Sequence, residues 1–197
     1  MIPRDTMTPI TLTDLSGNVL GKDIQHLTLA YGYGDGRELS CDSMVEAVSE
    51  LLDGLQIDGY LAMNRSVIAE MNDLAGGVTV TIETSDLEER DPELAKGKTV
   101  TLIGQQAENF VRYRDITIAH SALARMARQG QYIEEYMQAI QKKSAQEEQI
   151  IVILMDFIDK NMITNLAKDQ YLNIGKAILY GKEPFGQESI KNLPGEG

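Results

Sequence analysis

Residues 57–83 read IDGYLAMNRSVIAEMNDLAGGVTVTIE, and the hydrophobic period changes twice along this stretch. Apolar residues alternate at both ends, which predicts half-buried strands, and the spacing within 66–77 predicts a helix between them. We expect Gly76 and Gly77 to end that helix, because glycine adopts the left-handed conformation of a helix C-cap without steric cost. A strand, a helix and a strand in succession favour an α/β fold, with an α+β fold as the alternative.

A second alternating segment follows on the C-terminal side. Residues 98–104 read KTVTLIG and are expected to pair with 78–83 as the two strands of a hairpin. Residues 85–98 read SDLEERDPELAKGK, and the charges around Pro92 predict one exposed loop.

Helical spacing predominates in the rest of the chain. It predicts helices in DSMVEAVSELL at 42–52, in QEEQIIVILMDFIDK at 146–160 and in KDQYLNIGKAILYG at 168–181. A longer helix is expected to bury a stripe made of Leu123, Met126, Gly130, Ile133, Met137 and Ile140. The flanks of that helix would then carry Arg125, Arg128 and Gln129.

Length and composition favour one globular domain over residues 1–197, because a chain of 197 residues with 43% hydrophobic content can bury one core. Cys41 is the only cysteine, which excludes an intrachain disulfide, and we expect it to be a small buried side chain. The longest strongly apolar stretch, Ile150–Met155, is far below the roughly 20 residues that span a bilayer, so we expect this chain itself to be soluble.

The chain is acidic, and one segment departs from that character. A formal net charge of −12 repels phosphate backbones, so we expect no nucleic-acid partner. Residues 110–132, FVRYRDITIAHSALARMARQGQY, nevertheless contain Arg112, Arg114, Arg125 and Arg128, half of the eight arginines. Such a concentration of positive charge indicates a local site for an anion.

Two interpretations of these arginines stay open on the residues alone. They could pair with acidic loops in surface ion networks, each pair worth about 0 to 1 kcal/mol. Alternatively they converge on one point. Two guanidiniums about 7 Å apart repel by roughly 2 kcal/mol at an effective dielectric constant near 20, so a converging group favours a multivalent anion such as pyrophosphate. His120 in the same segment could donate to that anion.

Five segments occur in a fixed order along the chain: MIPRDTM, LTLAYGYGDG, IDGYLAMN with MNDLAGGVTV, GKTVTLIGQQAENFVRYR, and RMARQGQYI. Together they resemble the LytR-CpsA-Psr family of cell-envelope proteins, from residue 1 to about residue 140 and more loosely beyond. The resemblance implies a domain with a central mixed β-sheet flanked by helices, which binds a polyprenyl pyrophosphate lipid. The implied activity is a phosphotransfer that attaches the lipid-linked glycopolymer, of teichoic acid or capsule type, to peptidoglycan.

The resemblance implies five pyrophosphate-binding residues, which are Arg4, Arg112, Arg114, Arg125 and Gln129. Two of them, Arg112 and Arg114, would also act in catalysis by stabilising the charge on the reacting phosphate.

Three further residues are weaker candidates for this site. Asp5 would orient Arg4, and Arg128 would face solvent or an internal acid. His26 stands where the family often carries a lysine, and it could meet phosphate when protonated.

The family also implies Mg²⁺, held by aspartates on two strands that precede the I-P-R-D motif. Because this chain starts at Met1, we expect it to lack those strands, the Mg²⁺ ligands and the family's N-terminal membrane anchor, so no metal ligand is assigned. The anchored parent protein is expected to be extracytoplasmic, at the membrane surface.

Whether this chain alone is active stays open. Two alternatives to a phosphotransferase remain. One is a non-catalytic module that binds polyprenyl phosphate or wall polymer, and the other is an envelope-linked regulatory protein, after the family's older description as transcriptional attenuators.

Overall fold

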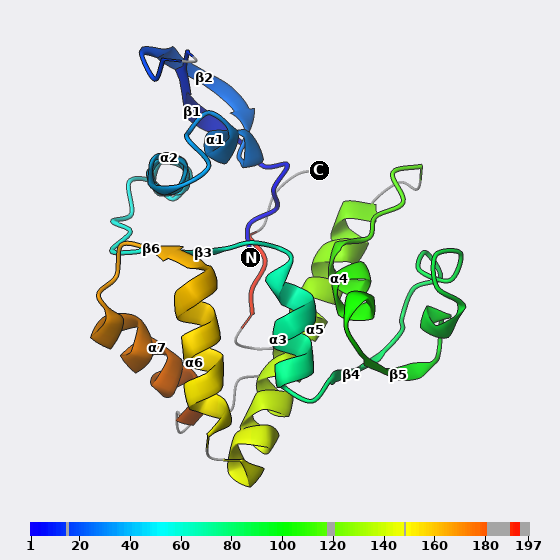
Figure 1. Cartoon of the computed structure of the whole chain (residues 1–197). Coiled ribbons are helices and arrows are strands. Elements are labelled where there is room, and N and C mark those ends of the chain that lie inside the picture. Colours follow the sequence, from blue (N-terminus) through cyan, green and yellow to red (C-terminus); the bar gives the residue numbers. More distant parts are fainter. Residues whose placement is uncertain (15, 118–120, 148, 181–189, 194–197) are drawn as a thin grey trace. The chain divides into compact units, whose positions relative to one another are not determined.

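A computed structural model describes residues 1–14, 16–117, 121–147, 149–180 and 190–193 (Figure 1). Contacts group the chain into two compact units. One contains Met1–Met63 and Met162–Gln170, and the other contains Asn64–Asn161 and residues 171–180. The single domain expected over residues 1–197 stays a prediction.

The first unit is built on a hairpin and two helices. Its elements are β1 (Met7–Thr13), β2 (Val19–His26), α1 (Thr28–Gly32), α2 (Glu38–Leu51), β3 (Leu61–Met63) and β6 (Met162–Thr164). β1 pairs antiparallel with β2, and β3 pairs antiparallel with β6. The core of the unit is formed by Ile10, Leu27, Ala30 and Ala47. The helix expected over 42–52 is confirmed as α2, which also buries Cys41 as predicted.

The strand expected at the start of 57–83 is shorter than its alternating pattern suggests. β3 comprises only Leu61–Met63. At Tyr60, side chains replace the strand ladder: the amide donates to Asn165 Oδ1 at 3.0 Å, and Thr164 Oγ1 donates to the carbonyl at 2.6 Å. Because both backbone groups of Tyr60 are engaged in this way, the pairing with β6 does not extend through it.

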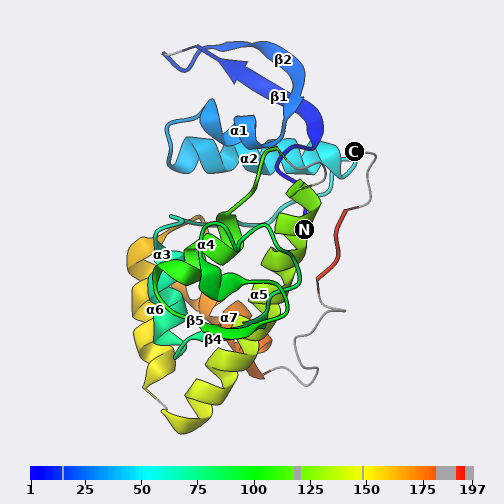
Figure 2. The ribbon, with the colours of Figure 1, turned by 90° about the vertical axis from the view of Figure 1, so that its right-hand side faces the viewer.

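The second unit holds most of the helices. Its elements are α3 (Val67–Leu74), β4 (Val78–Thr81), the 3₁₀ helix η1 (Pro92–Leu94), β5 (Thr99–Leu102), α4 (Gln105–Arg112), α5 (Ser121–Gln146), α6 (Ile150–Asn161) and most of α7 (Lys168–Tyr180). The first three residues of α7, up to Gln170, are grouped with the first unit. α5 is the long helix that the sequence predicts, and it packs against β4, α4 and α6 (Figures 1 and 2). Among the described residues, no helix combines the length and apolar character needed to cross a membrane.

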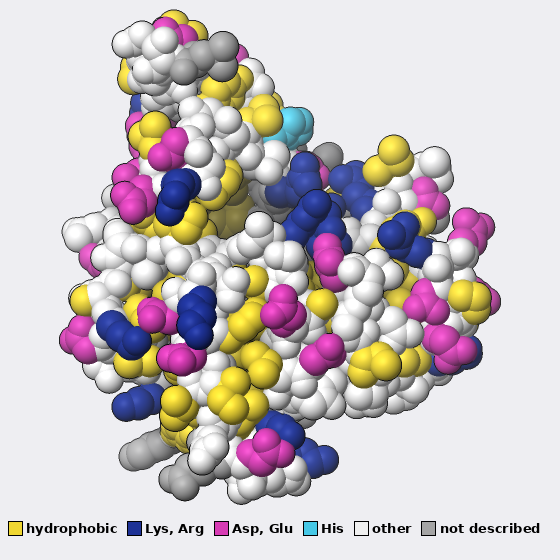
Figure 3. All heavy atoms as spheres, in the orientation of Figure 1, with side chains coloured by type: hydrophobic (Ala, Val, Ile, Leu, Met, Phe, Trp, Pro, Cys, Tyr) yellow, Lys and Arg dark blue, Asp and Glu magenta, His cyan; other side chains and the backbone are white. Residues whose placement is uncertain are grey.

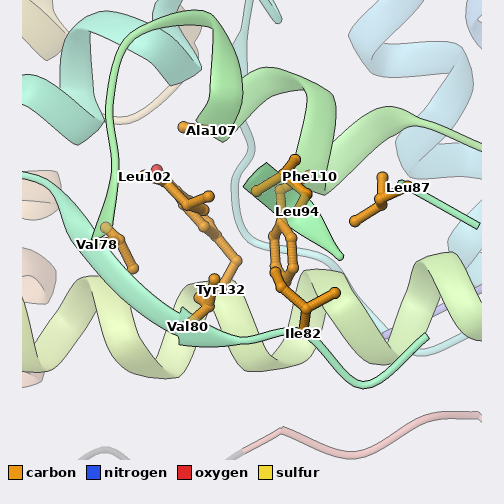
Figure 4. Packing of buried hydrophobic residues seen from close by; sticks show 9 residues of the cluster. All are labelled: Val78, Val80, Ile82, Leu87, Leu94, Leu102, Ala107, Phe110 and Tyr132. Carbon is orange, nitrogen blue, oxygen red and sulfur yellow. The ribbon is translucent and has the colours of Figure 1, made fainter. Parts of the chain in front are cut away.

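The hairpin predicted from the two alternating segments is confirmed. β4 and β5 pair antiparallel, with Val78 opposite Leu102. Their inward side chains join those of the loop, α4 and α5 in one fully enclosed cluster (Figure 4), whose members are Val78, Val80, Ile82, Leu87, Leu94, Leu102, Ala107, Phe110 and Tyr132. This cluster fixes the helix α4 against the hairpin.

The mixture of helices and strands confirms the α/β class, but the central mixed sheet is not found among the described residues. Their three sheets are each two-stranded and antiparallel. At the hairpin the reason is visible on β4. Ile82 exchanges backbone hydrogen bonds with Lys98 and Gly97, so the carbonyl of Thr81 faces away from β5. There it accepts from Gln131 Nε2 of α5 at 3.0 Å, a position that a third strand would use.

The exposed loop predicted for 85–98 is wrong in its interior. Leu87 and Leu94 are both 0% exposed, and they lie beside Phe110 in the core (Figure 4). The charged residues of this segment led to the prediction of an exposed loop, but the exposure of charged side chains does not determine the burial of the leucines between them. The loop is therefore packed against the core of the unit through these two leucines.

The buried stripe predicted for α5 is also wrong in part. Met126 and Ile140 are buried as expected, but Leu123 is 59% exposed and Arg128 is 3% exposed. The buried face of the helix is rotated toward the row of Arg128 and Tyr132. Both polar groups have partners that offset the cost of burial. The Tyr132 hydroxyl donates to Asn72 Oδ1 at 3.3 Å, and the Arg128 charge is paired with Asp86.

Gly77 gives a direct test of the turn between α3 and β4. Its φ is +88°, and an added Cβ would lie 2.7 Å from Thr101 Cγ2 and 3.0 Å from the Leu102 carbonyl oxygen. We expect Gly77→Ala to lower the free energy of unfolding by about 2 to 4 kcal/mol, through left-handed strain plus overpacking. Gly97→Ala is the matched control, since its φ is +87° with no atom within 4 Å. It should cost only about 1 to 2 kcal/mol in urea unfolding, and equal losses would contradict this account.

Candidate anion-binding site

The two arginines of the V-R-Y-R motif lie at the end of α4. Arg112 is the last residue of the helix, and Tyr113 leaves it with ψ of 139°. Both Arg112 and Arg114 line a pocket of about 240 Å³ together with Arg90, Glu108, Asn109 and Tyr113. The structure therefore brings the two arginines to one concave site.

Glu108 is the carboxylate of this pocket, one helical turn before Arg112. It forms an ion pair with Arg112 Nη1 and accepts a hydrogen bond from Gln105 Nε2 at 2.8 Å. The hydrogen bond from Gln105, followed by the one from Arg112, lowers the pKa of the Glu108 carboxyl. Glu108 is thus ionised at neutral pH and is the group with which an incoming anion competes for Arg112.

Arg114 is tied to the start of α5. Its Nε donates to Ser121 Oγ at 3.1 Å, and Ser121 is the buried first residue of that helix. The contact connects the pocket to the helix that carries Arg125 and Gln129. Figure 3 shows Lys and Arg side chains gathered in the region of α4 and the N-terminal end of α5.

Arg128 is buried, and its guanidinium contacts both the end of α4 and the loop before η1. Nε donates to the Phe110 carbonyl at 3.0 Å and Nη2 to the Tyr113 carbonyl, while Nη1 pairs with Asp86 Oδ2 at 2.6 Å. The side chains of Arg128 and Asp86 are 4% and 8% exposed. Of the two orientations expected for Arg128, toward solvent or toward an internal acid, the structure shows the second.

Gln129 makes a similar contact beside Arg128. Its Nε2 donates to the Val111 carbonyl at 3.2 Å, so two successive residues of α5 hold the last turn of α4. Arg125 lies one turn earlier on α5 and is partly buried. Neither Arg125 nor Gln129 is among the residues that line the 240 Å³ pocket.

The other candidates, Arg4, Asp5 and His26, come together in the first unit. Arg4 Nε lies 3.4 Å from Asp5 Oδ1, which is the orienting contact expected of Asp5. His26 Nδ1 lies 3.0 Å from the Asp5 carbonyl oxygen. Because a carbonyl oxygen only accepts, this nitrogen must carry the proton.

Mg²⁺ stays an expectation from the family resemblance. Among the residues that the structure describes, no three His, Cys, Asp or Glu side chains come close enough to hold a metal ion. His120 lies outside the described residues.

Arg90 is the pocket arginine that sequence reasoning missed. It lies in the charged loop, and its guanidinium carbon stands 5.6 Å from the centre of the Tyr113 ring. The sequence offered little signal, because an arginine between Glu88, Glu89 and Asp91 is most simply read as part of a solvated charged loop.

The buried ion pair can be tested by removing its acid. We expect Asp86→Asn to lower the free energy of unfolding by about 3 kcal/mol, because Arg128 would keep its charge in a buried place without a counter-charge. Glu88→Gln is the control, since Glu88 is exposed two residues away and should change stability by less than about 0.5 kcal/mol. Urea unfolding of both variants measures the difference. Equal stability would show that Arg128 does not depend on Asp86.

Comparison with known proteins adds a family and a fold. The model of the LytR_cpsA_psr family matches residues 1–192. Among solved structures, the Lin1025 protein from Listeria innocua is 26% identical with a TM-score of 0.57, covering 89% of this chain and 62% of that one. A search of curated proteins found no match.

Two structures of TagT are also similar. B. subtilis TagT is 23% identical with a TM-score of 0.64, covering 92% of this chain and 63% of that one. TagT bound to LI-WTA is 24% identical with a TM-score of 0.65, covering 92% and 63%. At these identities the two TagT structures show the fold alone. The chain spans less than two thirds of the length of each of these three structures.

Proposed function

Because the chain belongs to the LytR_cpsA_psr family, we propose that it binds the diphosphate of a polyprenyl pyrophosphate lipid and transfers the attached glycopolymer to peptidoglycan. The observation that carries this proposal is the pocket at the end of α4. Arg112 and Arg114 line it together, and the segment that bears them is held from behind by Arg128 and Gln129. Two planar guanidiniums in one pocket suit an anion with several oxygens, such as a diphosphate.

The polymer is proposed by similarity to a neighbour. TagT has been solved with LI-WTA, a ligand named for wall teichoic acid. For this chain, a phosphate-linked glycopolymer of teichoic acid or capsule type is the corresponding substrate. Peptidoglycan is the acceptor, which places the reaction outside the cytoplasm at the membrane surface where the lipid resides.

The transfer is a substitution at the phosphorus that carries the glycopolymer. A hydroxyl of a peptidoglycan sugar attacks this phosphorus, the bond to the bridging oxygen breaks, and polyprenyl phosphate leaves with that oxygen. The hydroxyl proton passes to water. Arg112 and Arg114 neutralise the charge that develops on the phosphoryl oxygens and on the leaving oxygen. This role is the catalytic assignment expected for the two arginines.

Other residues are proposed to bind rather than to react. Arg125 and Gln129 would hold the diphosphate from α5, since they lie one turn apart on that helix and Gln129 contacts the end of α4. Arg4 keeps the same role as an expectation from the family motif, with Asp5 orienting it and His26 nearby. Mg²⁺ remains an expectation from the family.

A reconstituted transfer reaction tests the proposed activity. The protein is incubated with a short-chain polyprenyl pyrophosphate that carries an oligosaccharide, together with peptidoglycan oligomers, and the mass of the oligomers is followed. We expect the mass to rise by the phosphate-linked oligosaccharide, and polyprenyl phosphate to be released in equal amount. Tight binding of the lipid without transfer would instead support the non-catalytic module.

The contribution of α5 to binding is tested with Arg125→Ala. Loss of a charge-assisted hydrogen bond worth roughly 1.5 to 3 kcal/mol should weaken binding of a short-chain polyprenyl pyrophosphate about tenfold to a hundredfold. Arg37→Ala is the control, because Arg37 is exposed at the start of α2 and outside every proposed contact. Titrations at fixed ionic strength measure both, with circular dichroism to check the fold. If the two variants bind equally, Arg125 belongs to ordinary surface charge.

Arg112→Lys separates charge from geometry. Lysine keeps the positive charge but loses the planar fork that forms two parallel bonds to phosphate oxygens. We expect clearly weaker binding of the same lipid, by about fivefold or more, from the lost hydrogen bond. Affinity equal to that of the unchanged protein would mean that Arg112 acts only as a point charge.

A further inference from the structure

Arg90 contacts an aromatic ring although acidic residues adjoin it in sequence. Glu88, Glu89 and Asp91 surround it in sequence, yet within the described part of the chain its guanidinium forms no ion pair. It lies instead over the ring of Tyr113, between the two arginines of the V-R-Y-R motif in sequence. A ring contact of this kind uses none of the five N–H donors of the guanidinium, so they stay available for a ligand.

The loop that carries Arg90 is held in place on both sides. The backbone amide of Arg90 donates to the carbonyl of Leu87 at 3.1 Å, and Leu87 is fully buried in the core. On the other side, the carboxylate of Asp91 accepts from the Glu93 amide at 3.0 Å and from Gln106 Nε2 of α4 at 3.1 Å. Asp91 is thereby committed to the loop and to α4, which explains why it does not neutralise Arg90.

The charges that line the pocket favour an anionic ligand. Its lining contains three guanidiniums, those of Arg90, Arg112 and Arg114, against the single carboxylate of Glu108. Because like charges held in one small pocket repel each other, this arrangement is stabilised when an anion enters. A diphosphate has enough oxygens to accept from several guanidiniums at once.

We infer that Arg90 is a third arginine of the anion site, which binds diphosphate oxygens from the loop side while Arg112 and Arg114 bind from α4. This inference rests on the proposed function, and it adds a residue that lies outside all five family-like motifs. Tyr113 is then the support that holds the Arg90 side chain at the pocket. The ligand class is a diphosphate, free or as the head of a lipid.

The test is a calorimetric titration of the full chain with inorganic pyrophosphate at fixed ionic strength. We expect Arg90→Ala to weaken binding about tenfold, and Arg90→Lys to recover only part of that loss because the fork is missing. Lys96→Ala is the matched control. It removes the same charge from an exposed position of the same loop, outside the pocket, and should change the affinity less than twofold. Since Arg90 is exposed, melting temperatures should stay unchanged in all three variants.

Comparison with Arg112→Ala separates this inference from the proposed function. If Arg112→Ala loses affinity while Arg90→Ala behaves like Lys96→Ala, the role of Arg90 is overturned and the diphosphate site stands. If the unchanged protein does not bind pyrophosphate at all, the proposed diphosphate site fails and this inference fails with it. A loss in Arg90→Ala and in Arg112→Ala but not in Lys96→Ala, with the melting temperature kept, supports both. A second titration with a short-chain polyprenyl pyrophosphate then shows, by comparing the two affinities, whether the site prefers a lipid headgroup or the free anion.

Discussion

The second unit depends on the solvation of one buried charge. The guanidinium of Arg128 is nearly inaccessible to water, so its hydration must be replaced by protein groups, and the replacements come from the loop and from the end of α4. Asp86 supplies the counter-charge from the loop, and the carbonyls of Phe110 and Tyr113 supply acceptors from the end of α4. Because an unpaired buried charge costs several kcal/mol, α5, the loop and the end of α4 are fixed relative to one another.

This constraint links folding to the proposed function. The carbonyls that Arg128 holds belong to residues on either side of Arg112, so the same contacts that satisfy a buried charge also place the pocket arginines. The ion pair of Asp86 and the burial of Leu87 hold the loop against the unit, and the loop places Arg90 in the lining of the pocket beside Tyr113. The pocket keeps more arginines than acids, because two nearby acids bind outside it: Asp86 pairs with Arg128 and Asp91 accepts from α4, which leaves Glu108 as the carboxylate of the lining.

Local patterns in the sequence predicted the elements of the fold better than its long-range contacts. The hairpin of β4 and β5 and the helix α5 follow from hydrophobic period, and Gly76 and Gly77 mark the end of α3 with φ of +86° and +88°. The concentration of arginines indicated Arg112 and Arg114, which do share a pocket. The sequence left two orientations for Arg128, solvent or an internal acid, and could not decide between them because the acid lies 42 residues away in a loop whose charges indicate exposure. Arg90 was missed for the same reason.

The central claim is that the Arg128–Asp86 pair positions the anion site, and the affinity of Asp86→Asn for pyrophosphate tests it most directly. The substitution removes a negative charge near the pocket, so simple electrostatics favours tighter binding of an anion. If Asp86 acts by fixing the segment of Arg112 and Arg114, binding should instead weaken severalfold in titrations under conditions where circular dichroism shows the variant to be folded. Unchanged or tighter binding by the folded variant would contradict the account.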